Sequence, residues 1–316
     1  MGDTTAISWC SHTFNPWWGC SRTSRGCQHC YAATLSNRWG FDLWQRQGPR
    51  KLMSESYWKR PLAWNRAAER AGVPATVFAA SMADVFEIHP REEVNGLLDG
   101  ARARLWDLID STPFLIWMLL SKRIENAAAL VPWGRQWPSN VWLGTSVEDA
   151  ERAEERLPVL ASLPAAVRFA SCEPLVGGLD LRPWLSGGLD WVITGGESGP
   201  GAAAAHPDWF RAIRDHCVEF SVPLHHKQNG MFVADAPVYG AGESEADWDP
   251  DALDVGGKGC VVNLDGSVPA SWDSHHLEVR EVPRAGAWSM RRVARACAAG
   301  RLLDGRVWDE RPRVMA

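Results

Sequence analysis

The stretch Phe114–Arg123, which reads FLIWMLLSKR, decides the fold class. Seven apolar residues end in a cluster of three polar ones, Ser121, Lys122 and Arg123. The apolar run is continuous and does not alternate with polar residues, which is typical of a strand covered on both faces, as in a parallel sheet. The stretch therefore predicts a buried strand with charged side chains at its carboxyl end.

The same pattern recurs along the chain and predicts parallel βα units. Other apolar runs that end in polar clusters are Ala75–Ala80, Val141–Leu143, Val167–Ala170, Trp191–Thr194 and Val222–His226. Amphipathic stretches separate them, among them Glu92–Ile109, Ala150–Leu160 and Asp208–Phe220. With a first strand near Ser8–Phe14, this alternation predicts about six or seven βα units in a full or partial (β/α) TIM-like barrel. A doubly wound open sheet is the alternative.

In such barrels the active site lies at the carboxyl ends of the strands. We therefore predict that the polar residues of these clusters bind a cofactor: Ser81, Asp84, Ser121, Lys122, Arg123, Ser146, Glu148, Glu173, Gly195, Gly196, Glu197 and Lys227. Helix capping is the alternative role, since Ser146 and Asp149 are good N-cap types. His225 and His226 adjoin Lys227, but adjacent strand residues point to opposite faces and do not easily share a metal.

The strongest chemical signal is the triplet Cys20, Cys27 and Cys30, spaced C-x6-C-x2-C on a polar loop. Three thiolates on one loop can hold three irons of a 4Fe-4S cluster and leave the fourth iron open. Zinc is the main alternative, with His29, Cys10 or His12 as fourth ligand. A disulfide with a free thiol is a weaker alternative. The scattered Cys172, Cys217, Cys260 and Cys297 are predicted to be buried structural thiols.

Together, the barrel, the triplet and the strand-end clusters are what radical chemistry with S-adenosylmethionine requires. The open iron would bind the amino and carboxylate groups of that cofactor. Strand-end side chains would hold its carboxylate and ribose, and the glycine-rich loop Gly195–Gly201 would let its amino group approach the backbone. If the chain is such an enzyme, an electron donor is an additional partner.

Composition bounds the class of protein. The chain has 316 residues, 46% hydrophobic and 22% charged, with a net charge of −5, so it is globular and not a polycation. Its longest clean apolar run, Phe114–Leu120, is far too short to cross a bilayer. The first residues show neither a basic segment nor a long apolar one, so a cytoplasmic location is expected.

Charge is unevenly distributed, which suggests three parts. Residues 1–231 would form the barrel, with the cysteine loop at 20–30. Within it, Met1–Arg66 holds nine basic residues, three acidic residues and seven tryptophans. Basic side chains among aromatic ones can bind nucleic acid, and the alternative is a solvated surface over an aromatic core. Residues 232–284 form an acidic insertion or lid, and residues 285–316 a basic tail with a predicted helix over Trp288–Arg301 that packs on the barrel.

Seven segments carry a resemblance to a known family: FNPWWGCSRTSRGCQHCYA, SMADVFE, LLSKR, WLGTSVED, RFASCEPL, WVITGGESGPGA and LLDGRVWDE. They run from Phe14 to Glu310 and resemble a phage-encoded three-cysteine-motif family that is also found in bacterial genomes. That family is similar, more distantly, to radical S-adenosylmethionine enzymes such as spore photoproduct lyase, whose usual triplet is C-x3-C-x2-C. The resemblance implies a partial barrel, a 4Fe-4S cluster on Cys20, Cys27 and Cys30, and a DNA lesion as substrate.

Three hypotheses about function follow. The first is a radical S-adenosylmethionine-like iron–sulfur enzyme that acts on nucleic acid, with DNA lesion repair as the candidate reaction. The second is a nucleic-acid-binding module in which a cluster or zinc is only structural. The third is a radical enzyme that modifies a small molecule or a partner protein, with residues 232–284 as a lid.

Overall fold

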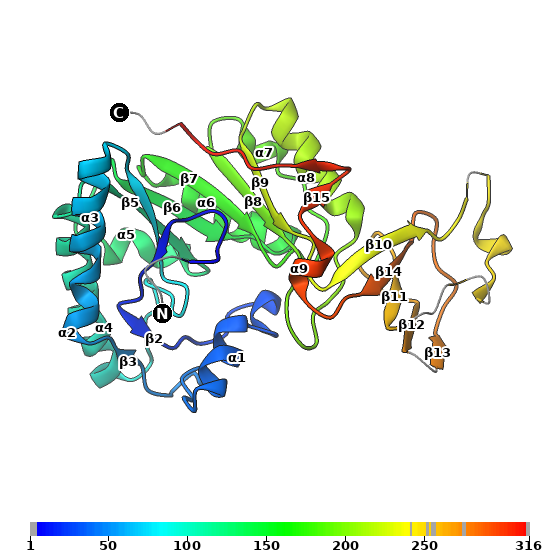
Figure 1. Ribbon diagram of the computed structural model, residues 1–316, viewed down its shortest axis with the longest axis horizontal. Helices are drawn as coiled ribbons and strands as arrows, with labels where there is room; N and C mark the ends of the chain where they lie inside the picture. Colours follow the sequence, from blue (N-terminus) through cyan, green and yellow to red (C-terminus); the bar gives the residue numbers. More distant parts are fainter. Residues whose placement is uncertain (1–4, 241, 251–252, 254–256, 274–275, 314–316) are drawn as a thin grey trace. The chain divides into compact units, whose positions relative to one another are not determined.

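Strand β5 (Leu115–Ser121) forms where the continuous apolar run predicts it, and six of its seven residues are buried. It belongs to a seven-stranded sheet of order β1-β4-β5-β6-β7-β8-β9 (Figure 1). The other strands are β1 (His12–Thr13), β4 (Ala75–Ala79), β6 (Val141–Ser146), β7 (Val167–Cys172), β8 (Trp191–Gly195) and β9 (Leu224–Gln228). The order follows the chain without reversal, so the sheet is a partial (β/α) barrel; a doubly wound sheet would reverse its order at a switch point.

The three helices predicted between the apolar runs are confirmed, with small shifts at their ends. Glu92–Ile109 lies within α4 (Glu92–Asp110), whose buried residues include Val94, Leu98 and Leu105 on one face. The other helices are α1 (Tyr31–Arg38), α2 (Glu55–Trp58), α3 (Arg60–Ala71), α5 (Ala127–Leu130), α6 (Ala150–Ser162), α7 (Arg182–Leu185), α8 (Pro207–Glu219) and α9 (Ala296–Ala299). Helix α3 contacts β4 and β5.

The structure, a computed structural model, describes residues 5–240, 242–250, 253, 257–273 and 276–313. Parts of the predicted insertion (241, 251–252, 254–256 and 274–275) and of the predicted tail (314–316) lie outside the described residues. The chain divides into two units. The first comprises residues 1–146, 154–171 and 187–191, and the second residues 147–153, 172–186 and 192–316.

A second sheet lies within the second unit, and it corrects one prediction. Five antiparallel strands have the order β10-β14-β11-β12-β13: β10 (Phe232–Pro237), β14 (Trp288–Arg292), β11 (Gly259–Val262), β12 (Ala270–Asp273) and β13 (His276–Val279). The prediction of a helix over Trp288–Arg301 is therefore wrong. Met290 pairs with Cys260 on one side and Ala234 on the other, so this backbone is satisfied by distant strands. Only Ala296–Ala299 is helical.

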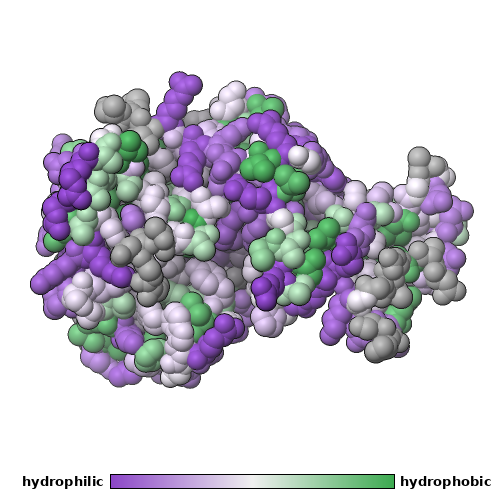
Figure 2. All heavy atoms as spheres, in the orientation of Figure 1, coloured by the Kyte–Doolittle hydropathy of each residue, from purple (hydrophilic) through white to green (hydrophobic). Residues whose placement is uncertain are grey.

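Two short pairs complete the described strands. They are β2 (Trp17–Trp18) with β3 (Lys51–Leu52), and β15 (Leu302–Leu303) with β16 (Arg306–Val307). On the face shown in Figure 2, hydrophobic side chains form small patches among hydrophilic ones. Within the described residues, no helix has the length and apolar character needed to span a membrane.

Candidate metal and cofactor site

The cysteine loop is attached at the carboxyl end of β4. Beyond that end, the Gly19 N–H donates to the Met82 carbonyl at 3.0 Å. After the loop, the Tyr31 hydroxyl donates to the Ser81 carbonyl at 2.7 Å. Gly19 has a φ of +110°, and a Cβ there would lie 2.8 Å from the Leu43 carbonyl oxygen, so only glycine fits. The three cysteines are thus carried by a loop that is fixed at both ends.

Arg123, which follows β5, joins this loop to the strand ends. Its Nη2 donates to the carbonyl and hydroxyl oxygens of Ser21 at 2.7 and 2.8 Å. Its Nη1 lies 3.0 Å from Asp84 Oδ2 and 3.5 Å from Cys20 Sγ. Asp84 in turn accepts from the Ser121 hydroxyl at 2.6 Å and from the Lys122 N–H at 3.1 Å. Four predicted residues are therefore brought together beside Cys20.

A second buried ion pair, which the sequence analysis missed, supports the first. Arg50 Nε and Nη2 donate to the two Glu87 carboxylate oxygens at 2.9 and 2.7 Å. The Ser21 hydroxyl donates to Glu87 Oε1 at 2.9 Å, so the pair also holds the cysteine loop. The available signal was an acidic residue inside the apolar run Val85–Ile88, because a buried charge requires a partner.

The three thiols differ in acidity. Burial by itself raises the pKa of the Cys27 thiol, but the charge of Lys122 and hydrogen bonds from Thr23 and Ser24 bring it below its usual value. Burial raises the pKa of Cys20 despite the adjacent Arg123, and burial also raises that of Cys30. Cys27 is thus the thiol of the three most ready to act as a thiolate ligand.

The three thiols of Cys20, Cys27 and Cys30 are ligand types that suit a soft metal centre. Their sulfur atoms are, however, not gathered around one point. Cys20, Cys27 and Cys30 are all free thiols, so none of them forms a disulfide. No group of three His, Cys, Asp or Glu side chains within the described ranges is gathered closely enough to hold a metal ion. For zinc, the alternative ligand His12 is stacked on Trp64 at 4.3 Å, and Cys10 is buried. Three thiols with cations beside them match the charge of a thiolate-ligated cluster.

The second unit holds a separate cluster of predicted residues. Lys227 Nζ lies 2.5 Å from Glu173 Oε1, and both side chains are partly exposed. Gly195 is beside this pair, since a Cβ there would lie 3.1 Å from the Glu173 carboxyl carbon. At Gly196 a Cβ would be 2.3 Å from the Asn229 carbonyl oxygen, so this glycine is required by close backbone packing. A cation and an anion therefore lie together, against a backbone that glycine lets them approach closely.

The remaining predicted residues have structural contacts. The Glu197 carboxylate accepts from the Ala203 N–H at 2.7 Å and so orders the glycine-rich loop. Ser146 and Glu148 are buried, and Glu148 accepts from the Val176 N–H through its backbone carbonyl at 2.9 Å. Asp149 accepts from the Arg152 N–H at 3.0 Å, which is the helix-capping role considered for it.

The basic N-terminal region has only a few aromatic side chains at its surface. Of its seven tryptophans, Trp39 is exposed and Trp44 partly exposed; Trp9, Trp17, Trp18, Trp58 and Trp64 are buried in the core. Most of this tryptophan content therefore serves packing. Arg22, Arg25 and Tyr31 are exposed on or beside the cysteine loop.

The comparison with protein families gives one match, described as Protein of unknown function (DUF5131), over residues 4–312. The chain belongs to the DUF5131 family. The match includes all seven sequence segments between Phe14 and Glu310 that carry the resemblance described above. The phage origin and the three-cysteine motif of the family remain predictions. A comparison with curated proteins gave no match.

Among solved structures, this DUF5131 protein is similar to variants of spore photoproduct lyase. One, with dinucleoside spore photoproduct, matches with a TM-score of 0.41 at 12% identity over 71% of this chain and 64% of that chain. Another, with bound AdoMet and dinucleoside spore photoproduct, matches with a TM-score of 0.37 at 12% identity over 72% and 66%. The chain thus spans less than two thirds of the length of these lyases.

The four scattered cysteines differ in burial. Cys172, Cys217 and Cys260 are buried as predicted, and burial raises the pKa of Cys217 and Cys260 to about 12. Cys297 is exposed, so its prediction as a buried thiol is wrong; it lies in the short helix α9, whose residues include none that are buried.

His225 and His226 have different partners, as the strand alternation predicts. His225 Nδ1 lies 2.7 Å from Asp309 Oδ1, whereas His226 Nδ1 lies 2.9 Å from the Thr194 hydroxyl. The two rings therefore do not form a shared metal site.

Proposed function

We propose that this DUF5131 protein is a radical S-adenosylmethionine-like iron–sulfur enzyme that acts on nucleic acid, with repair of a DNA base lesion as the candidate reaction. One observation supports it above all. The loop with Cys20, Cys27 and Cys30 is anchored at the carboxyl ends of β4 and β5, through Gly19 and Arg123. That end of a (β/α) sheet is where such folds assemble their active sites.

The residues around the loop would prepare the thiols for metal. Lys122 lowers the pKa of Cys27 and so favours its thiolate. The Arg123 guanidinium, 3.5 Å from Cys20 Sγ, would offset the negative charge of that ligand. When bound, a 4Fe-4S cluster would supply the electron that cleaves S-adenosylmethionine. We assign the three cysteines to the cluster and the buried Arg123 to positioning of the loop.

The second unit carries groups suited to the cofactor itself. The Lys227 ammonium can bind a carboxylate, and the Glu173 carboxylate can bind an amine or ribose hydroxyls. Both side chains are partly exposed, so a ligand can exchange their mutual contact for its own. Because Gly195 has no Cβ, the Glu173 carboxylate can pack closely against the backbone there, next to Lys227. We assign these three residues to S-adenosylmethionine.

The substrate assignment is supported by the surface of the first unit. Arg22 and Arg25 are exposed on the cysteine loop, and Tyr31 and Trp39 are exposed at the two ends of α1. Cations bind phosphates and aromatic rings stack on bases, so this surface suits a nucleic-acid strand.

The experiment that tests the proposal is anaerobic purification followed by iron, sulfide and zinc analysis and a visible spectrum. We expect about four irons and four sulfides per chain in the wild type. Cys27→Ala should lose them, because one of three thiolate ligands is gone. Cys297→Ala is the matched control: its thiol is exposed in α9 and should leave the metal content unchanged.

Turnover is then measured on the reduced protein with S-adenosylmethionine. Formation of 5′-deoxyadenosine, absent in Cys27→Ala, is the expected result. One zinc per chain without sulfide would overturn the radical mechanism and favour the nucleic-acid-binding module. A cluster without cofactor cleavage would leave the metal assignment standing and remove the enzymatic one.

A further inference from the structure

A cavity in the second unit lies among residues that none of the preceding assignments use. Its volume is about 680 Å³, which is in the range of small-molecule sites. The glycine-rich loop and the end of β14 contribute to its wall. Lining residues include Ser198, Gly199, Met231, Lys258, Arg292 and Arg295.

The charges at this cavity are all positive. Lys258, Arg292 and Arg295 line it, and within the described part of the chain no carboxylate forms an ion pair with any of them. The contrast with the next residue is direct, because Arg291 lies 3.0 Å from Asp235 Oδ1. Three cations around one cavity attract an anion, and their mutual repulsion is relieved when it binds.

Arg292 is held in place by its neighbours. Its Nη2 donates to the Gly199 carbonyl at 3.1 Å, and its backbone N–H donates to the Lys258 carbonyl at 2.7 Å. Its guanidinium also lies 5.8 Å from the centre of the Phe232 ring. A planar, fixed guanidinium suits the oxygens of a phosphate, while the exposed Lys258 and Arg295 can adjust to the ligand.

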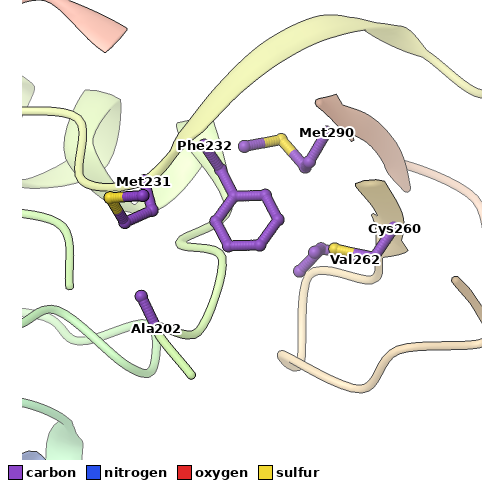
Figure 3. Packing of buried hydrophobic residues seen from close by; sticks show 6 residues of the cluster. All are labelled: Ala202, Met231, Phe232, Cys260, Val262 and Met290. Atoms are coloured by element: carbon purple, nitrogen blue, oxygen red, sulfur yellow. The ribbon is translucent and has the colours of Figure 1, made fainter. Parts of the chain in front are cut away.

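Part of the cavity wall is apolar. Met231 lines it and belongs to a buried cluster with Phe232 and Met290 (Figure 3). Val293 and Ala296 also line it, and Ala296 packs against the same cluster. The cavity therefore combines cations with an apolar surface that can cover a sugar or a base.

We propose that this cavity binds a phosphorylated nucleotide unit, with the phosphate on Lys258, Arg292 and Arg295 and the sugar or base against Met231. The cations and the apolar wall support the organic phosphate. The choice of a nucleotide rests on the proposed function. The unit could belong to a free nucleotide or to a DNA strand, and the test distinguishes the two sources.

The test is fluorescence anisotropy of the full chain with a labelled single-stranded oligothymidylate, with thymidine monophosphate and inorganic phosphate as competitors. The variant Lys258→Gln with Arg295→Gln should weaken binding at least tenfold. Its salt dependence should also become shallower by about 1.4 in log K against log salt, because two phosphate contacts are lost. The control is Arg280→Gln with Arg291→Gln, which removes two exposed, ion-paired arginines, one directly after β13 and one in β14.

Every outcome decides the proposal. Binding of the strand alone, or of the monophosphate as well, supports it if the double variant loses the affinity and the control keeps it. Absence of binding by the wild type overturns it, and so does equal affinity in wild type and double variant. Displacement of the strand by inorganic phosphate at the same concentration as by the monophosphate also overturns it. The measurement is repeated on Cys27→Ala, where unchanged binding shows that the cavity works without a metal centre, so failure of the cluster and failure of the cavity are told apart.

Discussion

Each unit has an ion pair beside its group of predicted site residues, and the two pairs are in different environments. In the first unit the side chains of Arg50 and Glu87 are 1% and 0% exposed. In the second, Lys227 and Glu173 are 27% and 19% exposed. A buried pair depends on its partner, because either charge alone would be desolvated without compensation. A partly exposed pair contributes little to stability and can be given up to a ligand.

The difference suggests a division of labour within the candidate machinery. Glu87 also accepts from the Ser21 hydroxyl, so the buried pair builds the cysteine loop. The Glu173–Lys227 pair lies beside Gly195, where its charges can reach a bound molecule. Charges that shape a site and charges that bind a ligand are therefore distinguished by burial.

The largest expected effect is that of breaking the buried pair. Arg50→Ala should lower the free energy of unfolding by about 3–5 kcal/mol, because the Glu87 carboxylate is left buried and unpaired. The measurement is urea denaturation of the metal-free chain. Adding Glu87→Gln to Arg50→Ala should recover part of the loss, since the stranded charge is removed. The comparison fails if Arg50→Ala costs no more than Arg104→Ala, which breaks an exposed pair with Glu55.

Much of the fold was predictable because its units are local. Continuous apolar runs locate β5 and β8, and amphipathic periods locate α4 and α8. The failure at Trp288–Arg301 has a physical reason. Alanine and arginine favour helix in isolation, but the backbone of β14 is paired with two distant strands, and such pairing overrides propensity.

The candidate site was predictable in part for the same reason. Spacing along the chain marked Cys20, Cys27 and Cys30, and strand ends marked Asp84 and Arg123. Arg50 could not be found in this way, since its partner Glu87 is 37 residues away, with α3 and β4 between them, and no local pattern connects the two. The sequence also does not tell which of the strand-end carboxylates caps a helix. Asp149 does so because local geometry brings its side chain to the Arg152 N–H.

An intermediate loss of stability is expected when either of two adjacent glycines of the second unit, Gly195 or Gly196, is replaced by alanine. Gly196→Ala places a Cβ 2.3 Å from the Asn229 carbonyl oxygen, so backbone must move, at a cost of about 1–3 kcal/mol. Gly195→Ala meets the Glu173 side chain at 3.1 Å, which can shift, so its effect on unfolding should be smaller. Urea denaturation of both variants checks the order of the two losses. Equal losses would show that Glu173 is as rigid as backbone.

The smallest effect on stability is expected when the partly exposed Glu173–Lys227 pair is broken. Lys227→Gln should change the free energy of unfolding by less than about 1 kcal/mol, because the pair is partly solvated. If its ammonium binds the cofactor carboxylate, the same variant should weaken S-adenosylmethionine binding about tenfold or more in equilibrium dialysis, and Lys227→Arg should restore part of it. A large loss of stability with unchanged binding would contradict this, and would place the Glu173–Lys227 pair with the charges that build the fold.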